Sequence, residues 1–111
     1  MSKFEISKRK NGEYQFNLKS SNGEVILTSE SYAAKISCKS GIESVKRNSQ
    51  QEEMYEKRTS KDGHYYFNLK AANGQIIGTS EMYNNSASRD SGIASVKRNA
   101  PEAIIIDLSN Q

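Results

Sequence analysis

The sequence predicts an α+β fold in which one mainly antiparallel sheet carries two helices on one face. The chain repeats itself, because residues 4–48 align without a gap with residues 55–99 and about half of the aligned positions are identical. Each copy contains runs of alternating apolar and polar residues around an Asn-Gly turn, which is typical of half-buried strands. Each copy then changes to a spacing of apolar residues that is typical of an amphipathic helix.

The size and composition favour a single domain with a thin core. The chain has 111 residues, of which 34% are hydrophobic, and one sheet with helices on one face suits that content better than a sandwich. We expect residues 1–111 to form one domain, with repeat one at residues 1–53 and repeat two at residues 54–111. Two copies suggest one chain that mimics a symmetric pair of half-domains, so we expect a monomer with internal pseudo-two-fold symmetry.

The length of the first turn decides the pairing of the first two expected strands, residues 3–9 and 13–20. A two-residue turn would place Phe4 and Ile6 on the opposite side from Phe16. A three-residue loop, Lys10-Asn11-Gly12, places Ile6 opposite Phe16 and gathers the apolar residues on one face. We therefore predict three-residue loops whose glycines take the left-handed conformation, at Gly12, Gly23, Gly63 and Gly74.

The third expected strand, residues 24–28, follows the turn at Gly23. The same loop length places Ile26 opposite Leu18, with Ile26 facing the core. Position 26 is isoleucine in both copies, whereas Leu27 is replaced by Gly78. This difference favours an outward position for Leu27.

Helices are predicted after these strands, near residues 33–48 in the first copy. Asn84 or Asn85 is a good N-cap for the second helix, which we expect to be shorter at its start because Arg89 replaces Cys38 in the apolar stripe. Gly41 and Gly92 lie inside the helices, where glycine costs about 1 kcal/mol relative to alanine. Close packing explains them better than a ligand resting on bare backbone.

The last apolar segment, residues 103–108, contains three consecutive isoleucines. It follows the second helix as residues 54–59 follow the first, so the strand that closes one unit opens the next. A run this apolar does not suit a free tail. We expect it to return to the sheet beside the N-terminal half.

Two stretches, FNLKSSNGEVILTSESY and SGIESVKRN, and their second copies resemble the signature of the YegP-like family of small bacterial proteins. The resemblance covers nearly the whole chain. It implies tandem β(3)-α-β units that build a single sheet by exchanging their C-terminal strands. It implies no activity and no site residues, because this family is a domain of unknown function.

Six basic residues are candidates for anion or nucleic-acid binding. Two pairs lie at equivalent places in the last turns of the helices and two lysines lie on the sheet face opposite the core: Lys46, Arg47, Lys97, Arg98, Lys19 and Lys70. The pairs could contact phosphates, or they could simply complement the helix dipole. The sheet face could stack single-stranded nucleic acid, although Tyr66 is its one expected aromatic residue, or it could be merely solvated.

The sequence offers little for catalysis or metal binding. Cys38 is the one cysteine and lies on the buried stripe, and His64 is the one histidine, with a glutamate at its twin position. No disulfide, zinc site or cofactor motif is expected within the chain. The segment near Met1 has no signal-like apolar run, so we expect a cytoplasmic protein without a membrane span.

We therefore expect a non-enzymatic binding or structural module that engages a macromolecular or anionic partner. The alternative is a nucleic-acid-associated protein that uses the six basic residues. The formal net charge of +3 is concentrated in repeat one, but it falls short of a nucleic-acid-binding signature by itself. An enzyme is the third hypothesis, and the sequence favours it least.

Overall fold

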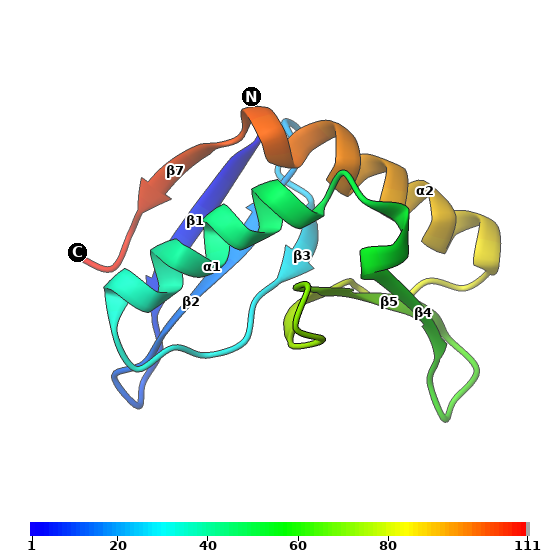
Figure 1. Cartoon of the computed structure of the whole chain (residues 1–111), viewed down its shortest axis with the longest axis horizontal. Helices are drawn as coiled ribbons and strands as arrows, with labels where there is room; N and C mark the ends of the chain where they lie inside the picture. Colours follow the sequence, from blue (N-terminus) through cyan, green and yellow to red (C-terminus); the bar gives the residue numbers. More distant parts are fainter. Residues whose placement is uncertain (111) are drawn as a thin grey trace.

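The computed structural model describes residues 1–110, which contain seven strands and two α-helices. The strands are β1 (Lys3–Lys8), β2 (Tyr14–Lys19), β3 (Val25–Thr28), β4 (Tyr55–Thr59), β5 (Tyr65–Lys70), β6 (Ile76–Thr79) and β7 (Ile104–Asp107). The helices are α1 (Lys35–Asn48) and α2 (Ser86–Asn99), with short 3-10 helices η1 (Glu52–Met54) and η2 (Ala100–Glu102). Both α-helices lie on the same face of the sheet, which confirms the predicted α+β architecture (Figure 1).

All seven strands belong to one sheet with the order β4-β5-β6-β3-β2-β1-β7. The repeats meet at its centre, where the equivalent residues Thr28 and Thr79 pair in an antiparallel sense. The strand that follows α1 is β4, which pairs with β5 of repeat two, and the strand that follows α2 is β7, which pairs with β1 of repeat one. The predicted exchange of C-terminal strands is therefore confirmed.

The register of the first hairpin is the predicted one. Ile6 pairs with Phe16 and Phe4 with Leu18, and all four side chains are fully buried. The glycines that close the four hairpin loops all have left-handed backbones, with φ of 87° at Gly12 and Gly23, 86° at Gly63 and 84° at Gly74. These loops set the pairing that gathers the apolar side chains on the face covered by the helices.

The prediction for β3 is wrong. Leu27, not Ile26, lies opposite Leu18, and the register shifts between Leu18 and Lys19. This bulge allows both Ile26 and Leu27 to be buried in the core. The space for Leu27 comes from Gly78, since a Cβ there would lie 2.7 Å from Leu27 Cδ2.

The expectation of a shorter second helix is also wrong, because both helices have 14 residues. The Asn85 side chain caps α2 by accepting a 2.8 Å hydrogen bond from the backbone N–H of Ser88. Arg89 places its guanidinium 5.3 Å from the centre of the Tyr65 ring, so its contact with the strand layer compensates for the missing apolar residue. Within residues 1–110, no helix combines the length and the apolar character needed to cross a bilayer.

The last strand runs parallel to β1, with Ile105 opposite Phe4 and Asp107 opposite Ile6. The backbone N–H of Leu108 donates to the Ile6 carbonyl oxygen at 2.8 Å. On the helix side, Asp107 Oδ2 lies 2.9 Å from Lys35 Nζ. The predicted return of the C-terminal segment to the sheet is therefore confirmed, and an ion pair links this strand to α1.

Acid is expected to loosen β7. Hydrogen bonds from Ser109 and Lys35 lower the pKa of Asp107 to about 2, below the value of about 3.9 for an unfolded aspartate. Because the pKa of Asp107 is lower in the folded chain, its carboxylate stabilises the fold at pH values above the pKa of the unfolded aspartate. This stability is lost as the pH falls from about 4 to about 2. The protection factors of the residue 104–106 amides, which correct for the intrinsic pH dependence of hydrogen exchange, should fall in that window.

The variant D107N is the control for this titration, because it removes the carboxylate and keeps the shape of the side chain. Its β7 amides should exchange faster than those of the unsubstituted chain at pH 6, with a weaker dependence on pH between 4 and 2. Equal pH profiles for the two chains would contradict a role for Asp107 in holding the strand.

Candidate binding surfaces

The two lysines predicted on the open face of the sheet are each paired with a carboxylate. Lys19 Nζ lies 2.8 Å from Glu5 Oε1, and Lys70 Nζ lies 2.9 Å from Glu56 Oε2 at the equivalent place in repeat two. Hydrogen bonding to Lys19 lowers the pKa of Glu5, and hydrogen bonding to Lys70 lowers the pKa of Glu56. Both carboxyl groups are therefore charged at neutral pH, and they offset the positive charge of the lysines.

The basic residues at the helix ends lie on the other face. Lys46 Nζ is 5.9 Å from the centre of the Phe4 ring, and Lys97 Nζ is 5.6 Å from that of Tyr55. Lys97 also forms an ion pair with Glu52. Arg47 and Arg98 are exposed. The six predicted residues thus occupy two faces, and the structure does not bring them together in one site.

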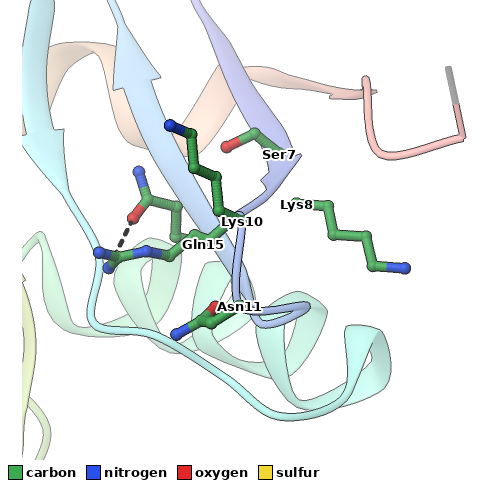
Figure 2. Close-up of a pocket in the computed structure, with 6 residues that line it drawn as sticks. Ser7, Lys8, Lys10, Asn11 and Gln15 are labelled. Atoms are coloured by element: carbon green, nitrogen blue, oxygen red, sulfur yellow. Dashed lines mark hydrogen bonds between the residues drawn. The ribbon is translucent and has the colours of Figure 1, made fainter.

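A basic cluster that the sequence analysis did not single out lies at the β1–β2 hairpin. Residues 8–10, Lys-Arg-Lys, line an open hollow of about 540 Å³ together with Ser7, Asn11 and Gln15. Figure 2 shows the Lys8 and Lys10 side chains extending in different directions from the hairpin. Arg9 donates to Ser31 Oγ at 2.7 Å and to Gln15 Oε1 at 3.3 Å.

The charges of this cluster are not offset locally. Among residues 1–110, no carboxylate lies within ion-pair distance of Lys8, Arg9 or Lys10, in contrast to Lys19 and Lys70. Three consecutive basic residues were the available sequence signal. The second copy has Thr59-Ser60-Lys61 at this place, so the cluster belongs to repeat one alone.

Two grooves with mixed polar and apolar linings lie where the repeats meet. One, of about 430 Å³, runs between the Tyr32–Arg47 part of repeat one and Asn73–Ile77 of repeat two. The other, of about 370 Å³, contains Glu24, Ile26 and Tyr83 at equivalent positions. Since the second groove carries Glu24 and Glu81 without a lining cation, the two differ in charge.

The two helix glycines, of which Gly41 lines the first groove, are explained by packing. A Cβ at Gly41 would overlap Tyr32 Oη, and one at Gly92 would lie 2.5 Å from Tyr83 Oη. The two tyrosine rings therefore occupy the space that a larger helix residue would need. This agrees with the packing interpretation of both glycines.

Cys38 and His64, the two side chains considered for catalysis, have different surroundings. Cys38 is fully buried, and burial raises the pKa of its thiol to about 11, so the reactive thiolate is scarce at neutral pH. His64 Nδ1 lies 3.1 Å from Asp62 Oδ1 in the β4–β5 hairpin. Within residues 1–110, no three histidine, cysteine or acidic side chains are grouped so that they could hold a metal ion.

Comparison with known proteins agrees with the architecture. Residues 10–56 and 60–107 each match the family described as Domain of unknown function (DUF1508). The UPF0339 protein YegP of Escherichia coli is 55% identical over 104 residues, which cover 94% of each chain. A UPF0339 protein of Acinetobacter baylyi is 53% identical over 106 residues, or 96% of each chain.

Two solved structures share the whole fold. The solution NMR structure of YegP from Escherichia coli, described as a protein of unknown function, superposes with a TM-score of 0.94 at 52% identity and covers 99% of this chain and 95% of its own. The solution NMR structure of a UPF0339 protein from Shewanella oneidensis gives a TM-score of 0.94 at 51% identity and covers 99% and 93%. The predicted resemblance is confirmed, and the chain belongs to the DUF1508 family with the domain present in two tandem copies.

Proposed function

We propose that this chain is a non-enzymatic binding module that engages a macromolecular partner through its surface. The observation that carries the proposal is that the groups with catalytic potential have structural surroundings. Cys38 is sealed in the core. His64 lies in an exposed hairpin, where its Nδ1 is 3.1 Å from Asp62 Oδ1 and the Ser60 hydroxyl accepts a hydrogen bond from the His64 backbone N–H at 3.0 Å. Charged and polar surface, by contrast, lies open at the hairpins and grooves.

The proposal takes a single chain in the cytoplasm as the working unit. The central β3–β6 pairing supports the single chain as the working unit, because one chain supplies both of the equivalent residues that pair there. A pull-down from bacterial extract with the tagged chain, with and without nuclease treatment, tests the proposal. Stoichiometric, nuclease-resistant capture of a defined protein is the expected result, and capture of none under any condition would refute it.

Nucleic-acid association is a second candidate, and the Lys8-Arg9-Lys10 cluster favours it. Cations without carboxylate partners are the ones that remain available for phosphates. Lys46, Arg47 and Arg98 would extend the contact on the helix side, whereas Lys19, Lys70 and Lys97 would first have to leave their carboxylates. This difference ranks the candidate residues and can be tested by substitution.

The test is fluorescence anisotropy with a labelled single-stranded oligonucleotide. If about three phosphates are contacted, affinity should fall about tenfold or more between 50 and 200 mM salt. The triple variant with serine at residues 8, 9 and 10 should lose the salt-dependent part of the binding affinity. The matched control is Lys61→Ser at the equivalent hairpin of repeat two, which should bind like the unsubstituted chain. Absence of binding at low salt would exclude this candidate.

A further inference from the structure

The two ends of the sheet are not equivalent. At one end, β7 lies beside β1, the first strand of repeat one. At the other end, β4, the first strand of repeat two, has β5 as its one neighbour. Figure 1 shows β7 and β4 at opposite ends of the molecule. Within residues 1–110, repeat two therefore lacks the strand that completes repeat one.

The burial of the two first strands differs accordingly. Phe4 and Ile6 of β1 are both fully buried, whereas at the equivalent positions of β4 Tyr55 is nearly buried and Lys57 has 44% of its side chain exposed. A cavity of about 190 Å³ lies between β4 and α2 and is lined by Ile93 and Ala94 together with Lys57, Asp90, Glu52 and Lys97. This cavity is on the helix side of the open edge.

The backbone of β4 also presents the groups that a strand would need. At the β1–β7 edge, the carbonyl of Ser2, just before β1, accepts from Ile104 N–H at 3.2 Å, and the Ile6 carbonyl accepts from Leu108 N–H, just after β7, at 2.8 Å. Of the equivalent residues of repeat two, Glu53 lies in η1 and Lys57 lies in β4, so Lys57 is the strand residue that offers the corresponding groups. Because residues of a strand alternate in the direction of their backbone groups, those of Lys57 point away from β5.

We propose that the β4 edge is a docking site for an extended segment of a partner protein, which lies parallel to β4 as β7 lies parallel to β1. The segment carries an aliphatic residue opposite Tyr55 and an acidic residue opposite Lys57. In the β1–β7 pair, Ile105 and Asp107 occupy these places opposite Phe4 and Ile6. This inference rests on the proposed binding function and names its partner class.

The charges at the open edge explain why the docked segment carries an acidic residue opposite Lys57. On the helix side of β7, Asp107 is held by Lys35 of α1, but the equivalent residue of α2 is Ser86. At the open edge, the cation is on the strand itself, since Lys57 replaces Ile6. Lys57 Nζ is 3.3 Å from Asp90, and both side chains are about half exposed, so this pair is weak and the ammonium can also serve a docked carboxylate.

A second copy of the chain fits the edge less well. An antiparallel pair of β4 strands centred on its middle residue would place Lys57 directly opposite Lys57, and like charges opposite one another destabilise a sheet. Exposed Lys57 and Arg58 also discourage pairing with arbitrary edges, as charges on edge strands commonly do. A partner strand that brings a carboxylate removes this penalty.

The probe for the test is a synthetic peptide with the sequence of residues 102–109, which contains the aliphatic and acidic residues in the required spacing. The isotope-labelled full chain is titrated with this peptide and followed by NMR amide shifts. We expect the shifts to change at residues 53–59 and along the Asp90–Lys97 part of α2. Lys57→Glu should weaken binding at least tenfold.

Lys61→Glu is the matched control, because it makes the same charge change on the adjoining hairpin loop and should leave the affinity within twofold. A peptide with lysine in place of its aspartate should lose affinity for the unsubstituted chain and regain it with Lys57→Glu. Lys57→Pro is a second variant, since it removes an outward N–H without breaking the β4–β5 pairing and should abolish binding. Unchanged melting temperatures verify that the variants fold.

The proposal is overturned if millimolar peptide leaves the β4 amides unmoved, or if Lys57→Glu and Lys61→Glu bind equally. Shifts confined to β1 and β7 would mean that the peptide exchanges with the resident strand β7, which would also refute the proposal. Concentration-dependent broadening of the β4 signals without peptide would mean that β4 pairs with a second copy, which would refute it as well. Each result is separate from the pull-down, because a chain that captures a partner equally with and without Lys57→Pro keeps its binding function and loses this docking site.

Discussion

Replacing Leu27 with alanine is expected to cost about 2–5 kcal/mol of unfolding free energy, the usual range for a buried leucine. Leu27 has no exposed surface and lies at the centre of the sheet, beside Gly78 of the other repeat. The substitution removes contacts on both sides of the junction between the repeats. Urea unfolding followed by circular dichroism gives the change, provided that the m-value stays constant.

Gly78→Ala is expected to destabilise the chain by about 1–3 kcal/mol, because the added methyl group overpacks the junction. The three nearest atoms, at 2.7, 2.7 and 3.2 Å from the new Cβ, all belong to Leu27. In the L27A background, the same change fills part of the cavity and should stabilise. The double-mutant cycle should therefore show a favourable coupling of at least about 1 kcal/mol, and additive effects would contradict the packing argument.

This junction marks the limit of what the sequence could predict about the fold. The pairing of Ile6 with Phe16 was predictable because the glycine-closed loop and the alternation of apolar residues constrain it locally. The position of Leu27 depends instead on the empty space at Gly78, which comes from a strand of the other repeat. A comparison of the copies revealed the Leu-to-Gly difference but not that these two residues touch.

The candidate surfaces also combine features that the sequence could predict with features that depend on distant segments. The pairing of Lys19 with Glu5 follows from the hairpin register, because Glu5 pairs with Asn17 and Lys19 is its diagonal neighbour. The sequence could therefore have predicted that this lysine is offset by a carboxylate. The freedom of the Lys8-Arg9-Lys10 cluster from carboxylates, and the open edge of β4, depend on how distant segments are arranged. Neither can be derived from spacing along the chain.

Gly92→Ala is expected to destabilise the protein, although alanine is the better helix former by about 1 kcal/mol. The new Cβ would lie 2.5 Å from Tyr83 Oη and 2.9 Å from Tyr83 Cζ. The Tyr83 ring is fixed at its base, because the backbone groups of Tyr83 and Tyr65 exchange hydrogen bonds of 2.7 and 2.8 Å. Displacing the ring should cost more than the helix gains, for a net loss of about 1–2 kcal/mol.

Removing the ring should reverse the sign of this effect. In a Tyr83→Ala background, the three contacts nearest to the added Cβ disappear, so Gly92→Ala should stabilise by about 0.5–1 kcal/mol through helix propensity. The same experiment at Gly41 should give only partial relief, because Phe16 Cε2 would remain 3.2 Å from the new Cβ after Tyr32 is removed. Chemical denaturation of the four chains at each site measures both cycles. If Gly92→Ala destabilised both backgrounds equally, the tyrosine would not be the reason for glycine in this helix.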